Sequence, residues 1–337
     1  MPHHHHRHNH DDGDDNDDDN DDDNHTNRER VRSGSIVVGN TTVVRGHDVA
    51  YTISSPSQRI IDSVYFLFNE YAHLSAPGKD RDANNALHHM HQSDIATWQL
   101  KLNFKMTKPV ASAKRGGAYE IGIVGNMTET KQQYSVICTT LREYMQDRTR
   151  AMSYDRALRM LELLRKQMTD LEVLNLSTPY YGLDDILVIN DVFFCFVNDD
   201  KLFGYDAGTK QMDVTRAISR AHAFYAPELL QPVNKINALP YSVDYRASYY
   251  SLGMLAAYCV LMKPELMSSA SGPSLVGGGR KKKMAAADRR DAGARIVSSA
   301  NIAALLHPIQ YTKLYWFIIR CCNDDLARIN SRMLIFV

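Results

Sequence analysis

The chain has 337 residues, of which 44% are hydrophobic and 23% are charged, with 39 basic and 39 acidic side chains. This length provides enough chain for one large domain or two small ones, and the hydrophobic content excludes a wholly disordered protein. Residues 1–27 contain ten aspartates and one arginine, which give −9, so the remaining residues carry +9. A remainder this mildly basic does not indicate a nucleic-acid-binding protein.

The composition also argues against membrane and disulfide-rich classes. No stretch reaches the roughly 20 apolar residues that a membrane-spanning helix needs, and no apolar signal core opens the chain. The five cysteines are odd in number and lack Cys-x-x-Cys spacing, so neither a disulfide framework nor a zinc site is expected. We therefore predict no membrane partner and an intracellular location, cytoplasmic or nuclear.

Two segments of low complexity flank the organised part. Residues 1–30 interleave histidine with aspartate runs and predict a disordered tail. This tail is interpreted either as a solvated polyanion or as a weak binder of transition metals, since imidazole and carboxylate groups both ligate metals. Residues 268–295 are rich in glycine and serine and predict a flexible insert. Its basic run, Arg280–Lys283, is typical of a nuclear import signal or of a solvated loop.

The first organised part is predicted to be mostly β. A helix should run from Pro56 to about Glu70, where apolar residues fall on one side. The strands are expected in runs of β-branched and aromatic residues with turn residues between them. The predicted strands are residues 36–38, 41–44, 49–53, 121–124 and 134–138.

The second organised part begins with a long helix. Leucine and methionine recur at spacings of three and four from Leu158 to Leu174, after a candidate N-cap at Ser153. An irregular segment over residues 177–185 is followed by two apolar runs that Asn190-Asp191 joins, which predicts a tight hairpin. The rest, apart from loops, is predicted to be helical.

Short motifs follow in a specific order. Ala226-Pro227-Glu228 is followed 20 residues later by Ser248-Tyr249-Tyr250-Ser251-Leu252-Gly253, and Arg320–Arg328 lies near the C-terminus. With the element order above, the chain resembles the eukaryotic-type protein kinases, and its divergence is similar to that of kinase-like genes in large DNA viruses. The resemblance implies an α+β, bilobal fold, with a β-rich N-lobe over residues 31–140 and a mainly helical C-lobe over 141–337. It also implies a buried helix around Gly253 and a buried ion pair between Glu228 and Arg328.

The resemblance assigns residues to the ATP and magnesium sites of a kinase. Gly34 opens the segment that corresponds to the glycine-rich loop, and Thr52 stands where a lysine normally grips the phosphates. Glu70 is the candidate partner of that missing lysine.

The catalytic loop is best matched by Thr178–Asp185. This alignment puts Tyr180 at the catalytic base and Asp185 at a metal-binding asparagine. Asn198 takes the place of the metal-binding aspartate of Asp-Phe-Gly. A tyrosine with a pKa of about 10 is a poor proton acceptor at neutral pH, and a neutral amide is a weaker magnesium ligand than a carboxylate.

These changes favour a pseudokinase that acts by binding a protein partner, such as a kinase or a kinase substrate. The alternative is a divergent Ser/Thr kinase with relocated carboxylates. In that interpretation Asp184 is a displaced base, Asp185 and Asp199 bind magnesium, and Lys101 or Lys105 reaches the phosphates of ATP. A metal-buffering protein driven by the histidine-rich and aspartate-rich tail is a third, minor interpretation.

Overall fold

The computed structural model describes residues 34–74, 102–112, 117–128, 130–146, 151–216, 223–230, 239–266 and 299–322. All of them belong to the second of the two units into which the chain divides after Ser33. The predicted tail and the predicted insert at 268–295 lie outside the described residues.

The part between Gly34 and Gly125 is mostly β, as the sequence predicts, and its strands form an antiparallel sheet. Its strand order is β1-β2-β3-β6-β4, and β5 also pairs with β6. Buried and partly exposed residues alternate along β2 and along the second half of β6, so that Val43 and Ile121 point into the core, and Ile53 on β3 is buried beside them. The strands are β1 (Ile36–Val38), β2 (Thr41–Arg45), β3 (Tyr51–Ser55), β4 (Phe104–Met106), β5 (Val110–Ser112) and β6 (Ala118–Gly125).

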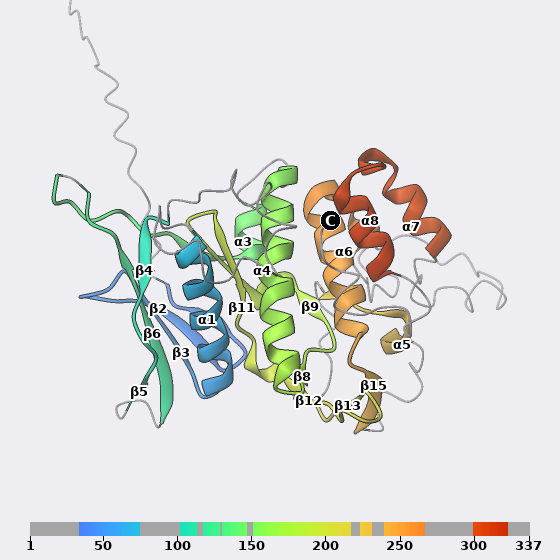
Figure 1. Ribbon diagram of the computed structural model, residues 1–337, viewed down its shortest axis with the longest axis horizontal. Coiled ribbons are helices and arrows are strands. Elements are labelled where there is room, and N and C mark those ends of the chain that lie inside the picture. The colour runs from blue at the N-terminus through green and yellow to red at the C-terminus, as the bar shows by residue number, and fades with distance from the viewer. Residues whose placement is uncertain are drawn as a thin grey trace, which may run out of the picture. The chain divides into compact units, whose positions relative to one another are not determined.

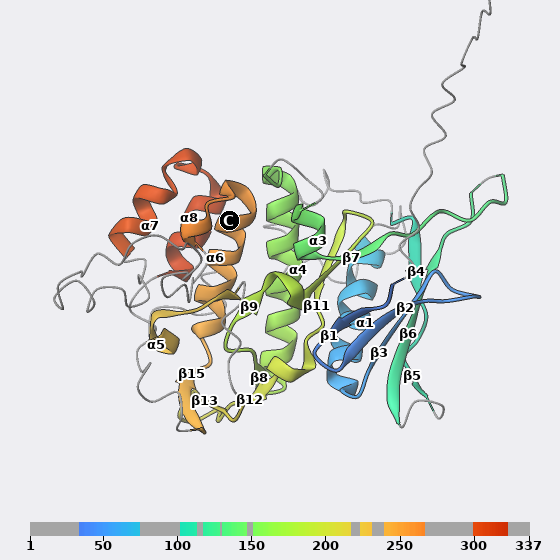
Figure 2. The same ribbon diagram turned by 180° about the vertical axis from the view of Figure 1, so that it is seen from behind.

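One helix, α1 (Gln58–Leu74), follows β3 directly and packs against β3 and β6 (Figures 1 and 2). Its buried side chains recur at helical spacing and include Ile60, Val64 and Leu67. The predicted helix is therefore confirmed, although it begins two residues after Pro56. The other side of α1 contacts α4 (Tyr154–Val173), so α1 lies between the sheet and the long helix.

The remaining helices gather around α4. The predicted long helix is confirmed, with Ser153 preceding its first residue. Helix α6 (Ala247–Leu261) lies against α4 and against α8 (Lys313–Cys321), and twelve of its residues are buried (Figure 1). The shorter helices are α3 (Leu141–Gln146), α5 (Pro227–Leu230) and α7 (Ser299–Leu305).

The predicted hairpin is also present. Strands β10 (Ile186–Ile189) and β11 (Phe193–Phe196) pair antiparallel and are fully buried, and β10 also pairs with β7 (Cys138–Thr140). The connection has three residues rather than two, and Asn190 and Asp191 both adopt the left-handed conformation, with φ of 49° and 61°. Two-residue type I′ hairpin turns require this conformation at both central residues.

Two expectations about strands were wrong. Residues 134–137 were predicted as strand, but β7 begins only at Cys138, because Tyr134 and Ile137 are exposed at the surface. The part after the hairpin was predicted to be helical apart from loops, but it also holds short antiparallel pairs. The strands after the hairpin are β12 (Phe203–Gly204), β13 (Gln211–Val214), β14 (Ala223–Phe224) and β15 (Tyr241–Asp244). β13 pairs with β15, whereas β12 and β14 pair with β8 (Leu176–Ser177) and β9 (Tyr181–Gly182), which precede the hairpin at the segment that was predicted to be irregular.

The fold class is mixed α+β, with an antiparallel sheet and several helices. All five cysteines carry free thiols and are buried. Within the described ranges, no helix combines the length and the apolar character needed to cross a bilayer.

Candidate functional site

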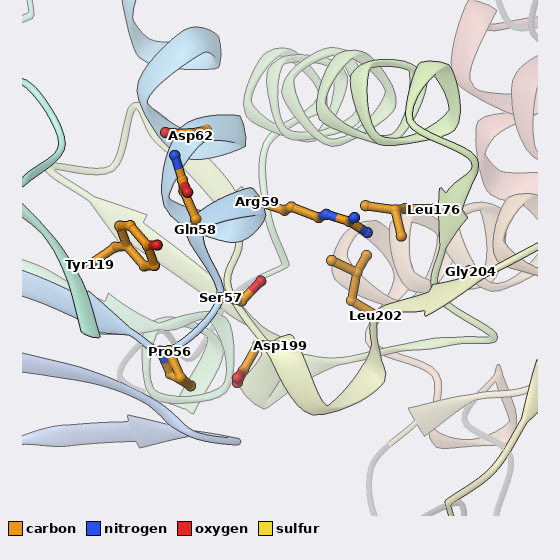
Figure 3. A pocket seen from close by; sticks show the side chains of 10 residues that line it. All are labelled: Pro56, Ser57, Gln58, Arg59, Asp62, Tyr119, Leu176, Asp199, Leu202 and Gly204. Carbon is orange, nitrogen blue, oxygen red and sulfur yellow. The ribbon is translucent and has the colours of Figure 1, made fainter. Parts of the chain in front are cut away.

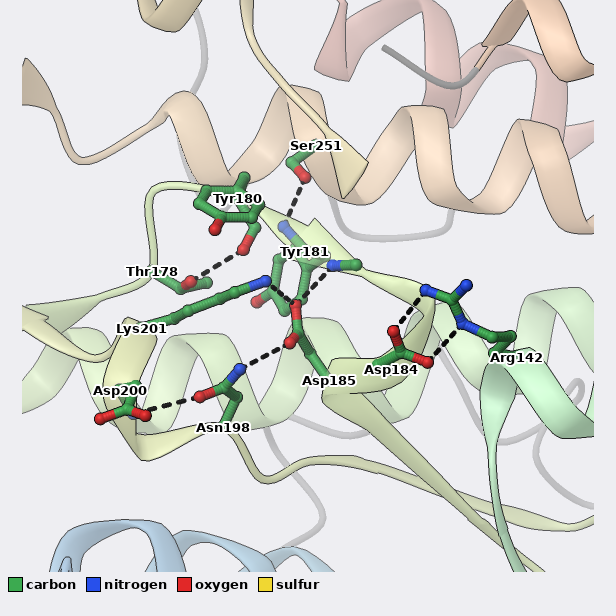
Figure 4. Close-up of polar contacts among 11 residues, drawn as sticks. Arg142, Thr178, Tyr180, Tyr181, Asp184, Asp185, Asn198, Asp200, Lys201 and Ser251 are labelled. Carbon is green, nitrogen blue, oxygen red and sulfur yellow. Dashed lines mark hydrogen bonds and ion pairs between the residues drawn. The ribbon is translucent and has the colours of Figure 1, made fainter. Parts of the chain in front are cut away.

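A buried carboxylate stands at the start of the hairpin. Asp185 ends the 3₁₀ turn η3 (Leu183–Asp185), directly before β10, and its side chain is only 3% exposed. It accepts hydrogen bonds from the backbone N–H of Gly182 at 2.6 Å and from the side-chain amide of Asn198 at 2.7 Å (Figure 4). Since a buried carboxylate is costly unless it is paired, these donors fix the loop before β10 to the segment after β11.

A lysine completes this arrangement. The side-chain nitrogen of Lys201 lies 2.5 Å from Oδ2 of Asp185 and 3.9 Å from the centre of the Tyr180 ring. The Tyr180 ring in turn packs on Tyr225, with ring centres 4.6 Å apart. The ammonium group therefore has a carboxylate on one side and an aromatic face on the other, which is a favourable position for a cation.

Lys201 was missed by the sequence analysis. The available signal was its position directly after Asn198-Asp199-Asp200, within 16 residues of the carboxylate that it binds.

The β1–β2 turn closes onto the same segment. The backbone N–H of Asn40 donates to Asp199 at 2.9 Å, and its side-chain amide donates to Asp200 at 2.7 Å. Gly39 has a φ of +59°, and a Cβ added there would lie within 3.1 Å of atoms of Asn198, Asp199 and Asp200. Only glycine allows this approach, because the turn lies on these three residues without a side chain between them.

The two partly exposed carboxylates of this segment, those of Asp199 and Asp200, are also engaged. Arg216 donates to Asp200 at 2.8 Å, so that this carboxylate has a guanidinium as well as the Asn40 amide. Burial raises the pKa of Asp199, and the N–H of Asn40 offsets part of that increase.

The structure thus brings together four of the sequence-predicted residues: Tyr180, Asp185, Asn198 and Asp199. Tyr180 is buried, and Thr178 donates to its backbone carbonyl. The loop is also held from the helical side, since the backbone N–H of Tyr181 donates to Ser251 on α6 at 2.6 Å (Figure 4).

Other predicted residues lie elsewhere. Asp184 is half-exposed and forms a two-pronged ion pair with Arg142 on α3 (Figure 4). Thr52 sits in the middle of β3, opposite Val44 and Gly122. At the end of β3, Ser55 accepts a hydrogen bond from the Thr41 hydroxyl at 3.0 Å, and this hydroxyl lies 3.5 Å from a carboxylate oxygen of Asp199.

Two further predicted residues lie away from the Asp185 cluster. Glu70 pairs with Lys166 on α4 at 3.0 Å. Gly34 is exposed and has open space around it. Of the two lysines considered for the phosphates, Lys105 is exposed on β4, and Lys101 lies outside the described residues.

The kinase resemblance also implied a buried helix around Gly253 and an ion pair between Glu228 and Arg328. Gly253 is buried in α6, and a Cβ there would lie 2.7 Å from Cβ of Cys321, so its lack of a side chain lets α6 approach α8. Glu228 has a buried carboxylate oxygen that no described residue meets with a hydrogen bond, and burial raises the pKa of this group. Its predicted partner, Arg328, lies outside the described residues, so this ion pair stays a prediction.

The residues at this site do not fit magnesium. Both oxygens of Asp185 already accept hydrogen bonds, and a divalent cation there would meet the Lys201 ammonium. Asn198 turns its NH₂ group toward Asp185, while its oxygen accepts from the backbone N–H of Asp200. Among the described residues, no three His, Cys, Asp or Glu side chains are grouped to hold a metal ion.

An open hollow of about 530 Å³ lies beside the site, at the N-terminal end of α1 (Figure 3). The first turns of α1 form one wall, and the segment from Asp199 to Gly204 forms the opposite one. Tyr119 and Leu176 complete it.

No protein-family model matches the chain, and no curated protein is significantly similar to it.

Proposed function

We propose that this chain is a protein-kinase-like protein that does not transfer phosphate and that acts by binding protein partners. The kinase-like part of the proposal is supported by the order of elements: a sheet with one helix, a long helix, a loop, a buried hairpin and further helices. It is also supported by the burial of α6 around Gly253 and by the buried carboxylate of Glu228, since the resemblance implies both.

The proposal that the chain does not transfer phosphate depends mainly on the contact between Lys201 and Asp185. Phosphoryl transfer by kinases depends on magnesium ions that bridge the phosphates and neutralise the developing charge. At the aligned position a side-chain ammonium already neutralises the carboxylate, at 2.5 Å. A magnesium ion would have to displace Lys201 from a site where the lysine is 16% exposed.

The β1–β2 turn supports the same proposal. In the kinase-like alignment this turn belongs to the segment that would cover the phosphates, and phosphates need free backbone N–H groups. Here the N–H of Asn40 is committed to Asp199, and Gly39 lies directly on Asn198 to Asp200. A triphosphate would require this turn to move away.

The relocated-carboxylate alternative has less support, because each carboxylate that it needs is engaged. Asp184 is bound by Arg142, Asp185 by Lys201 and Asp199 by Asn40. No group that could take a proton from a hydroxyl is left uncommitted among these three.

The test is phosphate transfer together with ligand-induced stabilisation. Purified full-length protein is incubated with radiolabelled ATP, magnesium and a mixed protein substrate, and its melting temperature is measured with and without Mg-ATP. We expect no transfer and no Mg-ATP-dependent stabilisation, whereas a ligand at 100 times its Kd would add about 2.7 kcal/mol. Transfer that disappears in both Asp185→Asn and Asp199→Asn would overturn the proposal, and the two variants separate intrinsic activity from a contaminant.

A further inference from the structure

Helix α8 has a buried face and an exposed face. The buried side chains recur at helical spacing, and α8 contacts α6 (Figure 1). They are Leu314, Phe317, Ile318 and Cys321. On the outer side, Lys313, Trp316 and Arg320 recur at similar spacing, and all three are exposed. The outer face of a surface helix is usually polar, but the centre of this one is an indole that is 51% exposed.

The turn before α8 exposes a second aromatic ring. Tyr311 is 84% exposed, and its φ of +69° lies in the left-handed region that a bulky side chain rarely adopts. Glycine would hold this turn without steric cost. The helix cap does not need the ring, because Thr312 accepts from the N–H of Tyr315 at 3.1 Å. The Tyr311 ring therefore adds strain and little burial, which is more typical of a binding residue than of a folding one.

The charge on this face has one sign. Residues 299–322 include Lys313 and Arg320 and no aspartate or glutamate. Each of the two cations also interacts with another group of the chain. Because an ammonium has three donors and a guanidinium has five, each can still accept a further carboxylate as a partner. Tryptophan, tyrosine and arginine are also the side chains enriched at the energetically dominant positions of protein interfaces.

These features favour an acidic protein segment over other ligands. Its carboxylates would meet Lys313 and Arg320, while an apolar side chain would cover the Trp316 ring and leave water. A nucleic acid is less suited, because its affinity depends on many phosphate contacts and this face offers two cations. A basic or purely apolar partner would leave the positive charge of the face without a complement.

We infer that the outer face of α8, formed by Tyr311, Lys313, Trp316 and Arg320, binds a segment of a partner protein in which acidic residues flank an apolar one. This inference rests on the proposed function, since it names a surface through which a protein-binding chain would act.

A peptide selection with a fluorescent readout at the face tests the inference. Randomised dodecapeptides displayed on phage are selected on the full-length protein, and enriched peptides are titrated by fluorescence anisotropy. The sequence contains two tryptophans, so Trp98→Phe leaves Trp316 as the only indole, and its emission reports whether a peptide covers the face. Phe66→Ala and Arg45→Glu are matched controls, because both side chains are exposed and lie outside α8. Melting curves verify that each variant is folded.

We expect enriched peptides that combine acidic with apolar residues and that shift the Trp316 emission to shorter wavelength. Trp316→Ala and Arg320→Glu should each weaken binding by about tenfold or more, whereas the two controls should bind like the parent chain. Tyr311→Gly should weaken binding without lowering the melting temperature, because glycine tolerates the left-handed conformation. This pair of readouts separates a binding role of the ring from a structural one.

Several outcomes would overturn the inference. These are no enrichment, enriched peptides without acidic residues, and equal binding by Trp316→Ala and Phe66→Ala. The emission of a buried indole before any peptide is added would also overturn it, since another segment of the chain would then cover the face. So would a thymidine oligonucleotide that shifts the emission and displaces the peptides.

Failure of this inference is distinguishable from failure of the proposed function. Phosphate transfer would overturn inactivity and leave the α8 face intact. Titrations without a shift at Trp316 would overturn the α8 face and leave inactivity intact.

Discussion

The side-chain nitrogen of Lys201 lies 2.5 Å from Oδ2 of Asp185, and this ion pair joins the loop before the hairpin to the segment after it. Both groups are largely buried, and the carboxylate also receives the N–H of Gly182 and the amide of Asn198. A charge that is already neutralised inside the fold provides little attraction for an external cation. Its main contribution is to hold two segments together.

Removing one partner of this pair should be costly. Lys201→Met leaves a buried carboxylate without its counter-ion, so we expect the free energy of unfolding to fall by about 3–5 kcal/mol. The double variant Asp185→Asn with Lys201→Met should lose less than the sum of the two single changes, because no buried charge is left unpaired. Urea denaturation of the four proteins measures this coupling. A loss below about 1 kcal/mol in Lys201→Met would contradict a structural role for the pair.

The closure of the β1–β2 turn depends on Gly39. Gly39→Ala adds a Cβ within 3.1 Å of three residues and places alanine at a φ of +59°. We expect a loss of about 1–3 kcal/mol in stability and faster hydrogen exchange at the N–H of Asn40, which donates to Asp199. Gly34→Ala is the control, since Gly34 has open space around it and should change stability by less than about 0.5 kcal/mol. Equal stability of the two variants would show that the turn does not rest on Asn198 to Asp200.

The close contact between α6 and α8 depends on Gly253 in the way that the β1–β2 turn depends on Gly39. Gly253→Ala puts a methyl group 2.7 Å from Cβ of Cys321, inside a packed interface. Alanine is the better helix former by about 1 kcal/mol, so a purely local effect would be stabilising. We expect the overpacking to outweigh this gain and to lower the melting temperature. A higher melting temperature in Gly253→Ala would mean that α6 and α8 are further apart than described.

The sequence predicted those parts of the fold that depend on residues close together in the chain, and it missed contacts between residues that are far apart in the chain. Helix α4 and the hairpin were predictable, because leucine spacing and the Asn190-Asp191 turn are local signals. Asn40 and Asp200 are 160 residues apart in the sequence, and no local pattern around either residue predicts their contact. The short pairs such as β13–β15 were missed for the same reason, since their strands are polar and far apart along the chain.

The contacts around Asp185 were likewise predicted only in part. The order of the motifs predicted that Asp185 and Asn198 lie near each other. In the structure, the side-chain amide nitrogen of Asn198 lies 2.7 Å from Oδ1 of Asp185. The sequence did not predict which group would balance the charge of Asp185, because Lys201, Arg142 and Lys105 are equivalent until their positions in space are known. The sequence analysis likewise named no counter-ion for Glu70, because Thr52 replaces the expected lysine, and the structure pairs Glu70 with Lys166 on α4.

A buried glutamate should make stability depend on pH. Burial raises the pKa of Glu172 to about 6, although Tyr249 donates to it at 2.6 Å and Lys210 also favours its charged form. Because the folded-state pKa is above the usual 4.5, the native state retains the proton more strongly than the unfolded state. Stability from this group is present below about pH 4.5 and is lost as the pH rises through 6. The loss is about 2 kcal/mol.

The variant Glu172→Gln isolates this effect from Asp199 and Glu228, whose pKa values burial raises in the same direction. Free energies of unfolding are measured at pH 5 and pH 7.5 for both proteins. The change from pH 5 to pH 7.5 should be about 1–2 kcal/mol more favourable in Glu172→Gln than in the parent. Parallel pH profiles would argue that Glu172 is solvated.

The most direct test of the central claim is the binding of manganese with ATP, because it asks whether a divalent cation reaches the carboxylate that Lys201 neutralises. Bound Mn²⁺ is counted by electron paramagnetic resonance in the parent chain and in Asp185→Asn, so that any metal held by the histidine-rich tail is present in both. The account predicts the same amount of bound Mn²⁺ in the two proteins. One equivalent that the parent chain binds and Asp185→Asn loses would contradict it.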